Sequence, residues 1–102
     1  MTSVEIRRVE ANKKQYLALL LLADEQEDMI DRYLERGSMY VLEDDGVKAE
    51  CVVTDEGGGV LELKNIAVEP DFQGKGYAKA LVDFLIRTYA GQYMPLLVGT
   101  GD

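Results

Sequence analysis

The sequence predicts an α/β fold whose elements run strand, helix, helix, strand, strand, strand, helix, strand. Several short stretches alternate apolar and polar residues, which is typical of half-buried strands. Other stretches repeat apolar residues every three or four positions, as on the buried face of a helix. The chain has 102 residues and no low-complexity tract, which fits a single domain over residues 1–102.

The N-terminal third predicts one strand and two helices. A strand is expected over residues 2–9, and Asn12 is the expected N-cap of a helix that runs through Leu22. Asp24, with a glutamate three residues later, is expected to cap a second helix that ends at Gly37. One face of this second helix is expected to pack in the core: Met29, Ile30, Tyr33 and Leu34.

Three strands are predicted in the middle of the chain. Residues 39–43 and 47–54 form two of them, joined by an Asp-Asp-Gly turn at residues 44–46. Residues 60–68 form the longest strand, after a glycine turn at residues 57–59. The strand at residues 47–54 is expected to carry four residues on one face: Val47, Ala49, Cys51 and Val53.

The last third predicts a helix and a short strand. Pro70 lacks a backbone donor and is expected to end the long strand. A helix follows from about Lys79 to Tyr89, Gly91 ends it, and a last strand covers residues 93–98. The apolar face of this helix is predicted to consist of Ala78, Leu81, Val82, Leu85 and Tyr89.

Composition limits the possible partners. With 11 basic and 19 acidic residues the net charge is −8, which disfavours binding to nucleic acid phosphates. The acidity could attract a cationic substrate such as an amine, or it could serve solubility alone. No apolar run approaches the ~18 residues of a transmembrane helix, so no membrane insertion is expected.

Cys51 is the only cysteine, and the chain has no histidine. An internal disulfide is therefore impossible, and a transition-metal site is not expected. Because Cys51 falls in a strand pattern, we expect a buried, inert thiol. Because a chain without disulfides is typical of a reducing compartment, a cytoplasmic location is expected.

The most informative stretch is Gln73-Gly74-Lys75-Gly76-Tyr77-Ala78, between the long strand and the last helix. A glycine turn that leads into a helix presents free backbone N–H groups and the positive end of the helix dipole, which suits a phosphate or pyrophosphate. A P-loop is excluded, because no Lys-Ser/Thr pair follows Gly76. A dinucleotide fingerprint is excluded, because Lys79 stands where a small residue is required. The alternative is an ordinary corner whose glycines only relieve backbone strain.

The pattern that fits is Q-x-x-G-x-A, at Gln73, Gly76 and Ala78, preceded by a strand and a proline bend. It resembles the acetyl-CoA pyrophosphate loop of the GNAT superfamily of N-acetyltransferases. The resemblance covers the whole chain in element order and implies a GNAT-like mixed sheet. Members of the superfamily continue past the fifth strand with a helix and usually two more strands, so this chain is expected to lack that C-terminal segment.

The resemblance implies residues that bind acetyl-CoA. In the superfamily the fourth and fifth strands splay apart and pantetheine pairs with the fourth strand, where the Ile66 N–H would polarise the thioester carbonyl. The implied cofactor-binding set is Ile66, Ala67, Val68, Gln73, Gly74, Lys75, Gly76, Tyr77, Ala78 and Lys79.

Glu62 is the candidate catalytic general base, because some family members place a glutamate on the fourth strand. The alternative is a solvent-facing glutamate among apolar neighbours, and Glu69 is a second candidate. Asn65 could orient substrate or pin a strand bulge. The family's usual acid is a tyrosine beyond the fifth strand, so no acid is assigned.

The predicted function is transfer of an acetyl group from acetyl-CoA to a primary amine of a small molecule or protein. The alternative is a non-catalytic CoA-binding or interaction module. An exposed apolar edge at residues 94–98 is also expected to pair with a second copy, as a homodimer.

Overall fold

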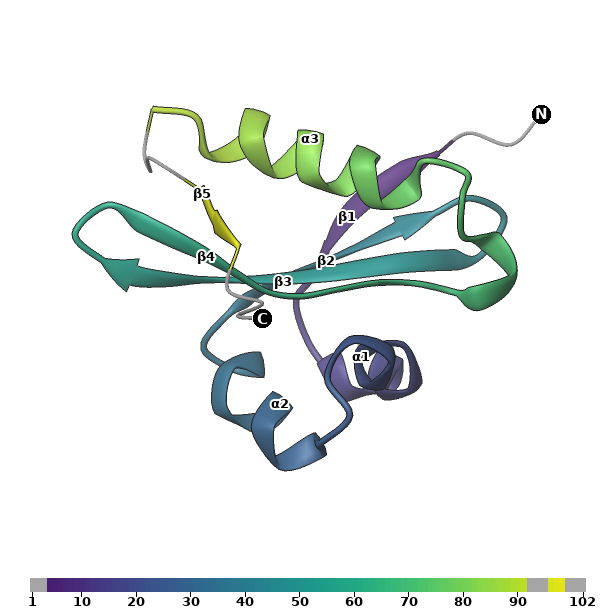
Figure 1. The fold of residues 1–102 in the computed structure, drawn as a ribbon, viewed down its shortest axis with the longest axis horizontal. Helices are drawn as coiled ribbons and strands as arrows, with labels where there is room; N and C mark the ends of the chain where they lie inside the picture. Colours follow the sequence, from purple (N-terminus) through teal and green to yellow (C-terminus); the bar gives the residue numbers. More distant parts are fainter. Residues whose placement is uncertain (1–3, 92–95, 99–102) are drawn as a thin grey trace.

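The computed structural model describes residues 4–91 and 96–98, and the predicted order of strands and helices is confirmed (Figure 1). The helices are α1 (Leu17–Ala23), α2 (Glu27–Leu34) and α3 (Tyr77–Tyr89), with short 3-10 turns at Lys13–Tyr16 and Pro70–Phe72. The strands are β1 (Glu5–Val9), β2 (Ser38–Glu43), β3 (Val47–Gly57), β4 (Val60–Val68) and β5 (Leu96–Val98).

The strands form one mixed sheet in the order β1-β2-β3-β4-β5. Strands β1 to β4 pair antiparallel, and β5 pairs parallel with β4 opposite Leu61–Leu63. The register between β3 and β4 shifts within this sheet, because Val52 pairs with Asn65 while Val53 pairs with Leu63. Lys64 is therefore the extra residue of a β-bulge, which bends the strand locally.

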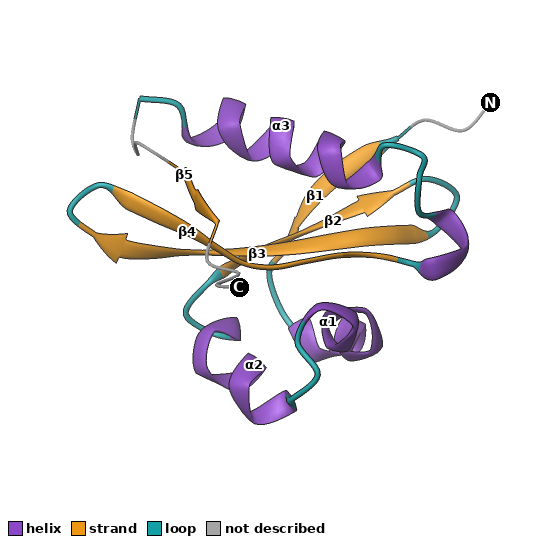
Figure 2. Cartoon of the chain, viewed as in Figure 1, coloured by secondary structure: helices purple, strands orange, loops and turns teal. Residues whose placement is uncertain are grey.

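Helices cover both faces of the sheet, with α3 on one face and α1 and α2 on the other (Figures 1 and 2). The core beneath α3 contains Tyr40, Leu42, Ala49, Cys51, Val53, Leu61, Leu63, Leu81 and Leu85. The core beneath α1 and α2 contains Val9, Leu20, Ile30, Tyr33, Leu34, Met39, Val41 and Val52. Cys51 is buried as expected, and burial raises the pKa of its thiol.

The two predicted helix caps differ in outcome. Asn12 is the N-cap of the 3-10 turn that leads into α1, as its position predicted, but it has a φ of 54° and its side chain makes no capping hydrogen bond. The N-cap of α2 is Gln26 rather than Asp24, so the second cap was predicted at the wrong residue. Asp24 Oδ1 accepts a long hydrogen bond from the Gln26 N–H at 3.5 Å, and Asp24 Oδ2 accepts one from the Tyr33 hydroxyl at 3.3 Å. The carboxylate is thus shared between the start of α2 and a side chain nine residues further on.

The apolar faces also differ in part from the prediction. The face of α3 that meets the core carries Tyr77, Ala80 and Phe84 beside Leu81 and Leu85, whereas Ala78 is exposed. Val47 packs against the opposite core, because the β2–β3 register shifts after Leu42. On α2, Met29 is 37% exposed while its three predicted partners are buried.

At the chain ends, β1 begins at Glu5, and the predicted residues 2 and 3 lie outside the described part, as do residues 93–95 of the last predicted strand. Among the described residues, no helix has the length and apolar composition to cross a membrane.

Candidate functional site

The turn between β4 and α3 presents backbone donors at one point. Gly74 and Gly76 have φ values of 81° and 86°, a left-handed conformation that glycine adopts without strain. The first helical hydrogen bond of α3 joins the Ala80 N–H to the Gly76 carbonyl at 3.0 Å. The N–H groups of Tyr77, Ala78 and Lys79 precede that bond and belong to the unpaired first turn. This is the geometry that binds a phosphate.

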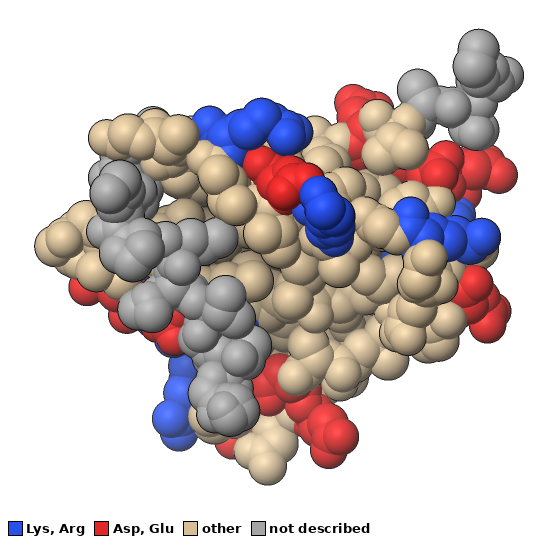
Figure 3. Space-filling view, turned by 45° about the horizontal axis from the view of Figure 1, so that its top comes forward, with Lys and Arg blue, Asp and Glu red and all other residues tan. Residues whose placement is uncertain are grey.

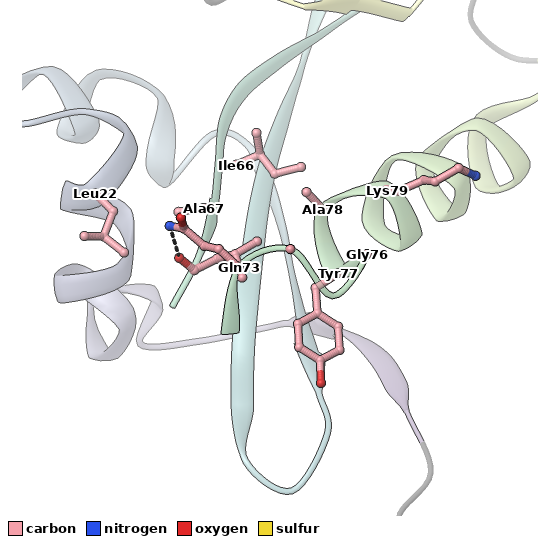
Figure 4. A pocket seen from close by; sticks show the side chains of 10 residues that line it. Leu22, Ile66, Ala67, Gln73, Gly76, Tyr77, Ala78 and Lys79 are labelled. Carbon is pink, nitrogen blue, oxygen red and sulfur yellow. Dashed lines mark hydrogen bonds between the residues drawn. The ribbon is translucent and has the colours of Figure 1, made fainter. Parts of the chain in front are cut away.

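A cavity of about 350 Å³ opens at this corner (Figure 4). It is lined by nine of the ten residues of the predicted cofactor-binding set: Ile66, Ala67, Val68, Gln73, Gly74, Gly76, Tyr77, Ala78 and Lys79. The tenth, Lys75, is exposed on the same loop. The sequence analysis missed Leu22, which reaches the cavity from the end of α1 and is half exposed.

Side-chain contacts tie this loop to the sheet. The Tyr77 hydroxyl donates a hydrogen bond to Asp44 Oδ2 at 2.5 Å, and this contact raises the pKa of Tyr77. Gln73 Nε2 donates to the Val68 carbonyl at 3.2 Å, the dashed line in Figure 4. Lys48 Nζ lies 4.7 Å from the centroid of the Phe72 ring. The turn before α3 is thus held by β4 and by the β2–β3 hairpin.

Charged groups of both signs surround the loop. Lys79 lines the cavity, but its side chain is 81% exposed and its Nζ lies 2.9 Å from Asp83 Oδ2. The view over α3 accordingly shows acidic and basic side chains next to each other (Figure 3). Asp83 therefore offsets part of the charge that Lys79 brings to this corner, whereas the backbone N–H groups of the first turn favour an anion independently of it.

The cavity borders the C-terminal part of β4, at Ile66, Ala67 and Val68. Within residues 4–91 and 96–98, the pairing of β4 with β5 covers Leu61–Leu63. A linear ligand could lie along the C-terminal part of β4 and place its anionic end against α3.

Asn65 anchors the bulge of β4 and is buried. Its Nδ2 donates hydrogen bonds to the Leu20 carbonyl at 3.1 Å and to the Tyr33 hydroxyl at 3.0 Å. Burial raises the pKa of Tyr33 to about 12, so its hydroxyl stays neutral. Of the two roles considered for Asn65, the contacts support pinning the bulge, because its amide is engaged by α1 and α2.

Glu62 lies on the same face of the sheet as α1 and α2, because its strand neighbours Leu61 and Leu63 belong to the opposite core. Its Oε1 is 3.0 Å from Lys64 Nζ, and both side chains are about one-fifth exposed. About 10 Å or more of extended strand separates Glu62 from Ile66. Proton transfer between Glu62 and a group at Ile66 would thus need one or more intervening waters.

A second cavity, of about 370 Å³, lies between α2 and the bulge of β4. Its lining was not predicted: Asp24, Met29, Arg32, Tyr33, Arg36 and Lys64. One feature of the sequence indicates this lining: Arg32 and Arg36 are four residues apart, which places them on the same face of a helix. Within residues 4–91 and 96–98, no group of three or more Asp, Glu or Cys side chains is arranged to hold a metal ion.

Comparison with known proteins identifies the family. Residues 35–100 match the family model described as the acetyltransferase (GNAT) domain. The chain belongs to the GNAT family. An uncharacterized N-acetyltransferase of Bacillus subtilis (strain 168), YvbK, is 36% identical to this GNAT chain over 83 residues, which is 80% of this chain and 54% of that protein.

Solved GNAT structures share the fold. A GNAT acetyltransferase from Elizabethkingia anophelis with acetyl-CoA bound has a TM-score of 0.88 at 31% identity, over 97% of this chain and 66% of its own. A Bacillus subtilis acetyltransferase in complex with CoA has a TM-score of 0.77 at 34% identity, over 84% of this chain and 57% of its own. The chain thus spans about half to two thirds of the length of these relatives.

Proposed function

We propose that the protein transfers the acetyl group of acetyl-CoA to a primary amine. The observation that carries this proposal is the cavity along β4, which ends at the backbone N–H groups of α3. Those donors suit the pyrophosphate of CoA. The stretch Ile66–Val68 suits the pantetheine arm, which carries the thioester to the middle of the strand.

Transfer needs a neutral amine, since an ammonium has no lone pair. The amine nitrogen attacks the thioester carbonyl, the oxyanion is stabilised by a backbone N–H at Ile66, and the thiolate of CoA leaves. Glu62 acts as the general base and takes the amine proton through water, because its carboxylate lies further along β4. Bound relatives support the cofactor assignment, since one structure holds acetyl-CoA and another holds CoA.

The rival is a CoA-binding module without catalysis. The GNAT family match and the acetyl-CoA complex of the Elizabethkingia anophelis relative favour transfer. An assay that follows CoA release from acetyl-CoA with a panel of primary amines distinguishes the two. Amine-dependent release is expected, whereas binding of CoA without release for any amine would support the rival.

Glu62→Gln is expected to lower kcat at neutral pH by about 10²-fold or more, the usual contribution of a general base. CoA affinity should stay unchanged, because Glu62 does not line the cavity along β4. A pH–rate profile of each variant measures the change in kcat. Glu69→Gln tests the second candidate in the same way, and Glu10→Gln, at an exposed glutamate outside both cavities, is the control. An unaltered profile for Glu62→Gln would remove Glu62 from the mechanism.

The proposal extends to a homodimer in the cytoplasm. β5 is the last strand of the sheet described, and its outer edge has no strand partner among residues 4–91 and 96–98. Such edges recruit other strands. Light scattering at micromolar concentration should therefore give twice the monomer mass. A monomer whose β5 amides are protected from hydrogen exchange would contradict the dimer.

A further inference from the structure

The second cavity is basic in an acidic protein. Three of its six lining residues are cationic, Arg32, Arg36 and Lys64, and one is acidic, Asp24. The net charge of the whole chain is −8, so a lining with three cations stands out from the rest of the protein, although Glu56 and Glu62 offset part of the charge of Arg36 and Lys64. Overall acidity suggested a cationic acceptor, whereas this lining is suited to an anion.

The bulge of β4 fixes one of these cations. Lys64 is the extra residue between Leu63 and Asn65. The hydrogen bonds of Asn65 to Leu20 and Tyr33 hold the bulge against α1 and α2. The backbone at Lys64 is therefore held in a fixed position beside α2. The Lys64 ammonium has three N–H donors, and its contact with Glu62 Oε1 leaves two of them for other acceptors.

Arg32 is the cation most available to a ligand. It is exposed, and no carboxylate of the described residues lies within 4.0 Å of its guanidinium. Arg36 is partly engaged, with its Nη2 3.3 Å from Glu56 Oε2. The carboxylate of Asp24 accepts a hydrogen bond from Tyr33. A planar guanidinium without a partner is the group that binds carboxylate or phosphate in a bidentate manner.

The second cavity lies close enough to the expected position of the thioester for one small molecule to reach both. Lys64 precedes Ile66 by two residues, which corresponds to about 7 Å along a strand. A small acceptor could therefore place its amine near Ile66 and an anionic group in the cavity at Lys64. The two cavities meet β4 at successive positions, Lys64 for one and Ile66–Val68 for the other.

We propose that this cavity binds the anionic group of the acceptor, so that the preferred acceptor is a primary amine that also carries a carboxylate or a phosphate. The inference rests on the proposed acetyl transfer. Arg32 and Lys64 bind the anion, Arg36 adds charge, and Met29 contacts the carbon chain between the anion and the amine.

The experiment compares primary amines that carry an anionic group with related amines that lack it. 4-Aminobutyrate is compared with its carboxamide, and phosphoethanolamine with ethanolamine, as acceptors with acetyl-CoA. The same four compounds are titrated calorimetrically into the chain saturated with CoA. The anionic member of at least one pair should bind and react about tenfold or more better than its neutral partner, as expected for a charge-assisted hydrogen bond. The pair that shows the preference distinguishes carboxylate from phosphate.

Arg32→Gln should remove most of this preference, because it weakens binding of the anionic acceptors far more than binding of the neutral ones. Its fold should be retained, because the side chain is exposed. Arg87→Gln, an exposed arginine of α3 outside both cavities, is the matched control and should behave as the unaltered chain. Equal use of charged and neutral acceptors, or a preference that survives Arg32→Gln, would overturn the anion site while leaving acetyl transfer intact. Arg32-dependent binding without any transfer would keep the anion site and refute the proposed enzyme activity.

Discussion

Gly76→Asp is expected to abolish the stabilisation of this chain by CoA. Gly76 is the N-cap of α3 with a φ of 86°, and it lines the cavity along β4. A carboxylate there would stand against the pyrophosphate and would take the N–H groups of the first turn for itself. At a CoA concentration 100 times its Kd, the unaltered chain should gain about 2.7 kcal/mol. For a domain of this size that corresponds to a rise in Tm of roughly 10 °C or more.

The control separates charge from backbone strain. Asparagine has nearly the shape of aspartate and tolerates a left-handed conformation, so Gly76→Asn carries the strain without the charge. A Cβ at position 76 meets no atom within 4 Å, so neither variant creates a clash. Gly76→Asn should keep part of the thermal shift with CoA, and Gly76→Asp should keep none. A full shift for Gly76→Asp would mean that CoA binds elsewhere.

The residues that line the cavity along β4 were predictable because the sequence features that indicate them are local. These features are contiguous in sequence: the proline bend, the glycines of the loop and the start of α3. Residues that are contiguous in sequence also lie close together in the structure. Leu22 was missed because it comes from α1, far away in the chain. Nothing in the pattern of an apolar helix distinguishes a leucine that borders a cavity from one that packs in the core.

Other errors arose where tertiary structure decided the outcome. Periodicity predicted that α3 is amphipathic, but only the packing against β3 and β4 selects Tyr77 and Phe84 over Ala78 for its core face. The placement of Val47 depends on a register shift, and one shifted residue moves side chains to the other face of a sheet. The basic cavity needs α2 and the bulge together, and no segment of the sequence contains both.

Glu50 was not singled out in the sequence, and its burial predicts an unusual pH dependence. It is fully buried on β3, and neither carboxylate oxygen has a hydrogen-bond partner among the described residues. Asn65 Oδ1 is likewise buried and unpartnered. Since Glu50 pairs with Ala67 in the sheet, Asn65 is its diagonal neighbour on the same face. A protonated Glu50 can donate to that oxygen, whereas a carboxylate cannot.

Burial raises the pKa of Glu50 from 4.5 to about 8. The folded state therefore holds a proton that the unfolded state has lost between these two pH values, and stability falls as the pH rises through this window. Each pH unit corresponds to about 1.4 kcal/mol, so the total loss across the window is on the order of 5 kcal/mol. The chain has no histidine, which leaves Glu50 as the main side chain that titrates in the window.

Urea unfolding at pH 5, 6, 7 and 8 should therefore show a steady decrease in the free energy of unfolding. Glu50→Gln should flatten this dependence and be more stable than the unaltered chain at pH 8, because its neutral amide can donate to Asn65 Oδ1 without ionising. Glu56→Gln is the matched control on the same strand: Glu56 is exposed, and a hydrogen bond from Thr54 lowers the pKa of its carboxyl, so its titration lies below the window. The decrease should persist in Glu56→Gln. A free energy of unfolding that is constant from pH 5 to 8 in the unaltered chain, or a slope that Glu50→Gln retains, would show that Glu50 is ionised and partnered in the folded protein.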